Sequence, residues 1–147
     1  MEINEIFLDI DAAENGRWFP YGDAEVRIAK WMNKGHATFL RDISKEHGLK
    51  FANNAISEEQ AEELNAGQWP HIITGLRGFT DGGKPVKWTA KLIKTLSVDP
   101  KWSAFFKSAI LLSKEEANYR EANIKALEKS SPSTLSGVTG GRVKKTD

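Results

Sequence analysis

The stretch GRWFPYGDAEVRIAKW, residues 16–31, gives the clearest sign of secondary structure in this sequence. Residues 17–21 and 25–30 are rich in the side chains that favour strands. They flank the pair Gly22-Asp23, which is typical of a tight turn. The stretch therefore predicts a β-hairpin over about residues 17–30.

Two details indicate how this hairpin should pack. Val26 and Ile28 alternate with polar or small neighbours, as in a strand that buries one face. Pro20 has no amide hydrogen to donate to a neighbouring strand. We therefore expect the first strand to lie at the edge of its sheet or to be irregular.

Beyond the hairpin the apolar spacing becomes helical. Ala37, Leu40 and Ile43 can share one helical face with Phe39, and Gly48 is a plausible end for that helix. A capping box, Ser57-Glu-Glu-Gln60, then begins a second helix. Gly67 and Pro70 interrupt it, and we expect a kinked or separate helix to continue through the apolar residues Trp69, Ile72, Ile73 and Leu76.

The third quarter of the chain holds further helix starts. Thr89 can cap a short helix, and Asp99-Pro100 places a capping side chain before a proline at the first helical position. A second capping box, Ser113-Lys-Glu-Glu116, predicts the start of a more polar helix. Between the last two signals lies the densest apolar stripe of the chain, formed by Trp102, Phe105, Phe106, Ala109, Ile110 and Leu112.

These signals predict a mainly α protein with a small N-terminal β-hairpin, an α+β fold in which the hairpin packs on a compact helical bundle. Residues 1–129 should form a single globular domain. Residues 130–147 are rich in Ser, Thr and Gly, cannot bury enough apolar surface, and should form a flexible tail. The expected core consists of Trp18, Val26, Ile28, Phe39, Leu40, Ile72, Ile73, Leu76, Leu92, Ile93, Leu96, Trp102, Phe105, Phe106, Ala109 and Ile110.

Composition narrows the function classes. The 147 residues include 21 basic and 20 acidic side chains, so no bulk cationic field is available to hold nucleic acid or an anionic membrane. Cysteine is absent, which excludes disulfides and thiolate chemistry. The N-terminus is acidic where a signal peptide would be basic, and no apolar run is long enough to cross a membrane. We expect a soluble intracellular protein.

The segment GFTDGGKP, residues 78–85, resembles the start of a phosphate-binding loop, G-x-x-x-x-G-K-[ST]. Pro85 stands where a hydroxyl should bind magnesium, and no helix can begin directly after Lys84. Asp81-Gly82-Gly83 is a strong turn signal. We therefore expect a turn and not a nucleotide site.

Other chemical sites are equally weakly indicated. His36, His47 and His71 have no metal-binding spacing. The acidic residues of segment 9–14 lack the glycine and closing glutamate of a calcium loop, so a solvated acidic arm is the better interpretation. No serine lies in a G-x-S-x-G motif. We expect no catalytic residues, no metal and no cofactor.

The remaining candidates are residues that could contact a partner. Residues 84–107 contain six lysines interleaved with two tryptophans, which gives nucleic-acid binding as a minor interpretation. The spacing of Lys87, Lys91 and Lys94 instead fits the solvated face of an amphipathic helix. The apolar stripe is also too wide to face only one way. The predicted partner-binding residues are Trp88, Trp102, Phe106, Lys87 and Lys91.

The order of segments resembles a family. GRWFPYGDAEVRIAKW is followed by a polar helix, by WPHIITGLRGFTDGGKPVKWT and by VDPKWSAFFKSAILLSKEEANY. Over about residues 8–128 this is similar to the tail assembly chaperones of long-tailed bacteriophages, small proteins encoded upstream of the tape measure protein. The resemblance rests on the early hairpin, the stretch ITGLRGFTDGGKPV at residues 73–86 and the Asp-Pro-x-Trp helix.

The resemblance implies a non-enzymatic function in the host cytoplasm. Such chaperones hold the tape measure protein, recruit tail tube subunits around it and leave before the virion is complete. Self-association is a further expectation. The alternatives are a structural virion protein of the tail or head–tail connector and, behind it, a small nucleotide- or nucleic-acid-binding protein.

The end of the chain adds one hypothesis. In phages of this type a minority of ribosomes slip near the end of the frame and add a second domain. The tail over 130–147 lacks an apolar stripe and could accept such a fusion without strain. We therefore expect the chain to be the short form, with a slip site near Lys144-Lys145.

Overall fold

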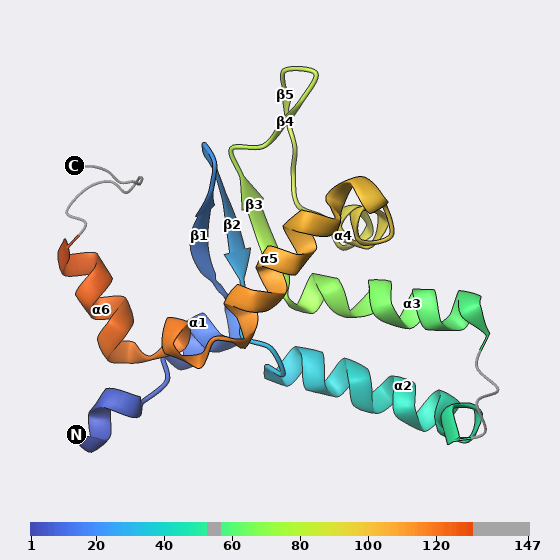
Figure 1. Cartoon of the computed structure of the whole chain (residues 1–147), viewed down its shortest axis with the longest axis horizontal. Coiled ribbons are helices and arrows are strands. Elements are labelled where there is room, and N and C mark those ends of the chain that lie inside the picture. The colour runs from blue at the N-terminus through green and yellow to red at the C-terminus, as the bar shows by residue number, and fades with distance from the viewer. Residues whose placement is uncertain (53–56, 131–147) are drawn as a thin grey trace.

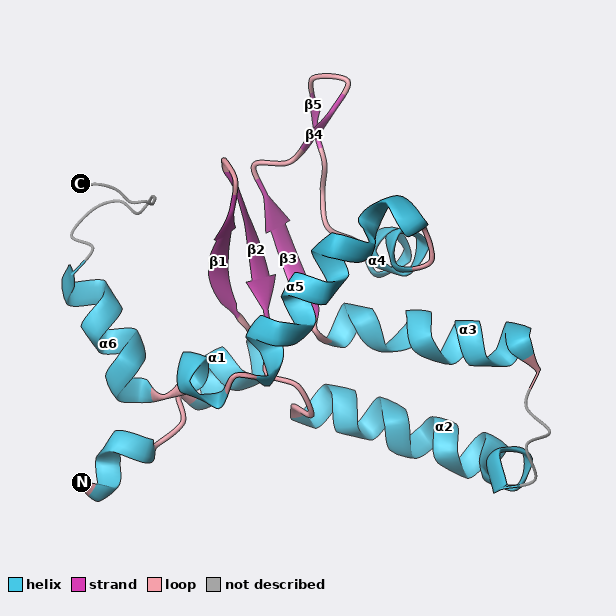
Figure 2. Cartoon of the chain, in the orientation of Figure 1, coloured by secondary structure: helices cyan, strands magenta, loops and turns pink. Residues whose placement is uncertain are grey.

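The computed structural model describes residues 1–52 and 57–130. The expected flexible tail and the slip site near Lys144-Lys145 lie outside the described residues, apart from Ser130 at the end of the last helix. The mainly α class with a small N-terminal antiparallel sheet is confirmed (Figure 2). No helix among the described residues is both long and apolar enough to cross a membrane.

The predicted hairpin forms two strands of a three-stranded antiparallel sheet. β1 (Arg17–Tyr21) pairs with β2 (Ala24–Ile28), and β2 pairs with β3 (Ile73–Arg77). The sheet order β1-β2-β3 places β1, with Pro20, at an edge as expected. Phe19, Val26 and Leu76 lie opposite one another across the three strands.

The third strand corrects the helix expected over residues 69–76. Only Trp69–His71 is helical, as a short 3-10 turn η2, and the chain then enters β3. Ile73 and Gly75 are buried on one face of the sheet. A Cβ at Gly75 would lie 3.0 Å from the Trp18 ring, so this glycine makes room for the indole. The spacing of the apolar residues fits either structure, and pairing with β2 decides between them.

Two helices run side by side away from the sheet (Figure 1). They are α2 (Lys34–Ala52) and α3 (Glu58–Gln68). The capping box at the start of α3 is confirmed, because Ser57 Oγ accepts from Gln60 N at 3.0 Å and Gln60 Oε1 accepts from Ser57 N at 3.1 Å. The predicted end at Gly48 is wrong. That glycine lies within α2 with open space around it, where its helical cost is about 1 kcal/mol.

The second half of the chain folds back on the sheet. A small hairpin of β4 (Thr80–Asp81) and β5 (Lys84–Pro85) precedes α4 (Ala90–Ser97). The 3-10 turn η3 (Pro100–Trp102) then leads into α5 (Ser103–Lys114). Both predicted caps are confirmed: Thr89 Oγ1 accepts from Leu92 N and Asp99 Oδ1 from Lys101 N, each at 3.0 Å.

The capping box expected at Ser113 is wrong. Ser113 is fully buried inside α5, and its hydroxyl donates to Ala29 O at 2.8 Å. Glu115 precedes the next turn, η4 (Glu116–Tyr119), and its carboxylate accepts from Ala117 N. The last helix, α6, spans Glu121–Ser130. A long-range hydrogen bond to the loop after β2 therefore replaces the local cap that the spacing indicated.

The acidic lead-in is not the free solvated arm that the sequence predicted. It forms the 3-10 turn η1 (Ile3–Ile6) and α1 (Ile10–Asn15), which Asp9 caps through Ala12 N at 3.0 Å. Backbone hydrogen bonds fix it to the C-terminal elements. Asp9 N donates to Tyr119 O and Glu121 N donates to Phe7 O, both at 2.8 Å.

The main core lies where α4, α5 and η2 pack on the sheet. Half of the expected core residues are buried, namely Val26, Ile28, Ile72, Ile73, Ile93, Phe105, Phe106 and Ala109. The other half are only partly buried: Trp18, Phe39, Leu40, Leu76, Leu92, Leu96, Trp102 and Ile110. The sequence missed Phe19, Trp69 and Tyr119, which are also buried.

Candidate functional site

An apolar groove opens between the small β4–β5 hairpin and the helices α4 and α5. Its cavity volume is ≈ 340 Å³. Apolar side chains from β3, α4, η3, α5 and the loops on either side of the β4–β5 hairpin form most of its wall. The lining residues are Leu76, Phe79, Thr80, Asp81, Val86, Leu92, Leu96, Trp102 and Phe105. We call this site the apolar groove.

Helix α4 presents one face to the core and another to the groove. Ile93 is fully buried and anchors the helix. Leu92 and Leu96, one turn apart, are only half-buried and line the groove. The cap at Thr89 sets where this helix begins. The groove therefore retains apolar surface that the fold itself does not cover.

Aromatic rings form the opposite wall. Phe105 packs edge-on against both Trp102, with ring centroids 5.2 Å apart, and Phe79, at 6.2 Å. Tyr21 packs edge-on against Phe105 at 5.1 Å. Such perpendicular ring pairs are favourable and directional. They hold Phe79 and Trp102 in place at the groove without burying them fully.

The segment that resembled a phosphate-binding loop forms the hairpin beside the groove. Asp81 pairs with Lys84, and Gly82 and Gly83 have φ angles of 58° and 82°. Two successive positive φ angles are typical of a type I′ turn between antiparallel strands. No helix follows until Ala90, so the amides of a helix N-terminus do not converge here. The predicted turn is confirmed.

The predicted partner-binding residues separate into two groups. Trp102 lines the groove, and Lys87 and Lys91 are exposed next to the lining residues Val86 and Leu92 in the sequence. The remaining two, Trp88 and Phe106, are occupied inside the fold and are considered next.

Phe106 is a buried core residue. It is 6% exposed and packs edge-on against Trp69 at 4.7 Å. Trp88 is half-buried against the core, and its indole Nε1 donates to Ile73 O at 2.7 Å. Both residues therefore stabilise the fold. The sequence reasoning missed Phe79, Val86 and Leu92 as site residues, because no local motif distinguishes them from core.

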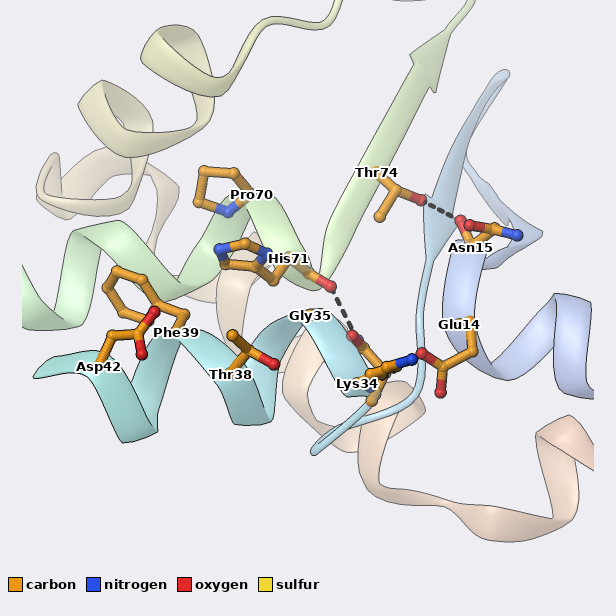
Figure 3. Close-up of a pocket in the computed structure, with 11 residues that line it drawn as sticks. Glu14, Asn15, Lys34, Gly35, Thr38, Phe39, Asp42, Pro70, His71 and Thr74 are labelled. Atoms are coloured by element: carbon orange, nitrogen blue, oxygen red, sulfur yellow. Dashed lines mark hydrogen bonds between the residues drawn. The ribbon is translucent and has the colours of Figure 1, made fainter. Parts of the chain in front are cut away.

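A second hollow, the polar pocket, lies between α2, η2 and the end of α1 (Figure 3). Its cavity volume is ≈ 600 Å³. The figure shows the rings of Phe39 and His71 facing each other, with Asp42 beyond Phe39. The complete lining is Glu14, Asn15, Asn33, Lys34, Gly35, Thr38, Phe39, Asp42, Pro70, His71 and Thr74.

Several polar side chains that line this pocket form hydrogen bonds within the fold. Glu14 Oε1 accepts from Lys34 N at 2.9 Å, at the start of α2. Asn33 Nδ2 donates to both Lys30 O and His71 O at 2.9 Å, and Asn33 Oδ1 accepts from His36 N at 3.0 Å. The Thr74 hydroxyl donates to Asn15 O at 2.6 Å. These groups have structural partners and are not directed at a ligand.

Two histidines lie at this pocket, His71 in its lining and His36 beside it. His36 is fully buried, and its Nδ1 accepts from Met32 N at 3.0 Å. The proton must therefore sit on Nε2, which donates to Gln68 Oε1 at 2.9 Å. Burial, together with the nearby His36 and Lys94, lowers the pKa of His71 below its usual 6.5.

Neither hollow contains a set of groups arranged for catalysis in the described part of the chain. No hydrogen bond there links the His71 ring to a hydroxyl or a carboxylate, as a nucleophile–base pair would require. Residues 1–52 and 57–130 also hold no cluster of three metal-binding side chains. The lining of the apolar groove is mostly aliphatic and aromatic, which suits it to contact an apolar group.

No family model, curated protein or solved structure matches this chain.

Proposed function

We propose that this protein is a non-enzymatic tail assembly chaperone of a long-tailed bacteriophage, which binds the tape measure protein and helps recruit tail tube subunits. The observation that carries the proposal is the apolar groove, an uncovered apolar surface next to exposed lysines. The resemblance of residues 8–128 to that family indicates the tape measure protein as the partner. The groove supplies a surface on which such a partner can be held.

The groove favours a particular kind of segment. Leu92 and Leu96 present apolar surface, and Asp81 is the one charged residue of the lining. The exposed Lys87 and Lys91 are adjacent in the sequence to the lining residues Val86 and Leu92. An amphipathic helix with apolar residues on one face and acidic residues beside them complements this surface. The tape measure protein is expected to be very long and helical, so it can offer many such segments.

The proposal also states where the protein acts and whether it stays in the finished particle. The chaperone acts in the host cytoplasm and is absent from the finished particle. A structural protein of the tail or connector would instead remain in purified virions. Immunoblotting of purified particles separates these two functions, because the chaperone is expected in the infected-cell lysate and not in the particles.

Co-expression with the tape measure protein of the same phage tests the binding. The wild-type chain should keep the tape measure protein soluble and co-purify with it. Leu92→Glu, which places a carboxylate in the groove, should reduce the co-purified amount about tenfold or more, as expected for loss of an apolar anchor.

A matched control is available on α5. Leu111 is 73% exposed and does not line the groove, so Leu111→Glu makes the same chemical change elsewhere and should bind as the wild type does. The proposal is wrong if the folded wild-type chain captures no tape measure protein. Equal loss in both variants would remove the groove as the binding site.

A further inference from the structure

The glycine-rich segment that resembles a phosphate-binding loop has a defined place beside the apolar groove. It forms the β4–β5 hairpin and the turn before it, and the hairpin extends past the end of β3 at the top of the view (Figure 1). Every residue from 80 to 85 is exposed, so the hairpin does not serve to fill the core. It does supply Thr80 and Asp81 to the lining of the groove.

The base of the hairpin is fixed on the sheet. Gly78 has a φ of 85°, and a Cβ there would lie 3.2 Å from Ala24 Cα, so a side chain would be strained and would crowd β2. The next residue, Phe79, stacks on Tyr21 with ring centroids 6.4 Å apart. Val86 N donates to Phe79 O at 2.9 Å and closes the base of the hairpin. These contacts hold the hairpin at one position beside the groove.

Asp81 is the one charged residue in the lining of the groove, and the fold gives its carboxylate no partner. Lys84 lies opposite it across the hairpin. Over residues 1–52 and 57–130, however, no ion pair or side-chain hydrogen bond includes the Asp81 carboxylate. While the groove is empty this carboxylate is exposed to water, and a solvated surface charge contributes little to stability.

A segment that enters the groove changes the surroundings of this carboxylate. The rest of the lining is mostly apolar and carries no positive charge. Removing a carboxylate from water without a partner is costly, and an acidic group opposite it would add repulsion. A lysine or arginine on the bound segment would offset this cost by pairing with Asp81. The groove therefore distinguishes between apolar segments by the charge that they carry at one position.

We propose that Asp81 determines which segment the apolar groove accepts, by pairing with a lysine or arginine at the edge of the apolar face of that segment. This inference rests on the proposed function, because it concerns the segment of the tape measure protein that the groove holds. The segment carries this basic residue facing the β4–β5 hairpin, in addition to the acidic residues that suit the exposed Lys87 and Lys91. An apolar segment with an acidic residue opposite Asp81 is rejected.

Charge substitutions in the chain co-expressed with the tape measure protein test the proposal. Asp81→Asn removes the charge at nearly constant size, and we expect about threefold less captured tape measure protein. Asp81→Lys places a positive charge against the basic residue and should reduce capture about tenfold or more. Asp42→Lys makes the same change at an exposed residue of the polar pocket and should capture as the wild type does. Because the Asp81 carboxylate has no partner in the fold, chemical denaturation should give wild-type stability for both Asp81 variants.

A charge exchange gives the sharpest result. Benzoylphenylalanine at Thr80 should crosslink to the segment next to Asp81, and mass spectrometry then identifies that segment. Replacing its lysine or arginine with glutamate should reduce capture by the wild-type chain and restore capture by Asp81→Lys.

Three results would overturn the proposal while the wild-type chain still captures the tape measure protein. They are equal capture by Asp81→Lys and the wild type, equal loss in Asp42→Lys, and a crosslinked segment in which no exchanged charge restores capture. A folded wild-type chain that captures no tape measure protein is a different result, because it contradicts the proposed function and this inference with it.

Discussion

The apolar groove and the polar pocket differ in how completely their lining side chains already interact with the rest of the fold. In the larger polar pocket, Asn33 makes three hydrogen bonds with the backbone, and Glu14 and Thr74 each bond to a backbone group. In the smaller groove, Leu92 and Leu96 line the cavity and are only half-buried.

This difference indicates which hollow binds a partner. Glu14, Asn33 and Thr74 in the polar pocket already form hydrogen bonds within the fold, so a ligand would gain little from these three groups. Filling the groove would remove apolar surface from water, at about 25 cal/mol for each Å² buried. The volume of a cavity is therefore a poorer guide to function here than the state of the groups that line it.

The largest expected effect on stability comes from removing the hydrogen bonds of Asn33 in the polar pocket. Asn33→Ala removes three hydrogen bonds and leaves Lys30 O, His71 O and His36 N without this partner. We expect the free energy of unfolding to fall by about 2–4 kcal/mol, since His71 O and His36 N are left unsatisfied or must find water, while Lys30 O keeps the bond from the backbone N of residue 33. Chemical denaturation measures this. Thr38→Ala, at an exposed position of the same pocket, should change it by less than about 0.5 kcal/mol.

A smaller effect should distinguish a structural tryptophan from a binding one. Trp88→Phe removes the donor to Ile73 O and keeps an aromatic ring, so we expect a loss of about 1–2 kcal/mol in denaturation. Capture of the tape measure protein by the folded variant should be unchanged. A wild-type denaturation midpoint together with lost capture would contradict the assignment of Trp88 to the fold.

A substitution in the groove should affect binding more than stability, which is the opposite of the effect that we expect for Trp88→Phe. Leu92 is half-buried, and a carboxylate there can still reach water. We expect Leu92→Glu to cost less than about 1 kcal/mol of unfolding free energy while it weakens capture of the tape measure protein. Thermal or chemical denaturation of the variant provides the check. Unfolding at ambient temperature would show that the groove wall is core.

The smallest expected effect is on the pH dependence of stability. Burial beside His36 and Lys94 lowers the pKa of His71, so the unfolded chain takes up this proton more readily than the folded chain. The contribution of His71 is therefore complete above about pH 6.5 and is lost as the pH falls through the folded pKa. His71→Gln should flatten this part of the curve. The half-exposed position keeps the difference small.

The sequence predicted what local geometry determines. Ser57, Thr89 and Asp99 each act within three residues of their own position, and all three cap as expected. The hairpin and its edge strand follow from alternation and from the chemistry of proline. These features need no knowledge of distant segments.

Two of the failures come from partners that are distant in the sequence. Ser113 bonds to Ala29 and does not cap, and β3 forms because β2 lies beside it. The groove is the clearest example: Leu76, Val86 and Trp102 meet there from three separate segments. Their apolar character was visible in the sequence, but the side left uncovered is fixed only by the packing of α4 and α5.

Site-specific photocrosslinking tests most directly whether the groove is the partner site. Thr80 lines the groove and Thr38 lines the polar pocket, and both are exposed, so benzoylphenylalanine at each position gives a matched pair. Irradiation of cells that also make the tape measure protein should crosslink that protein from position 80 and not from position 38. Crosslinking from position 38 alone, or from neither position while the two proteins still co-purify, would contradict the account.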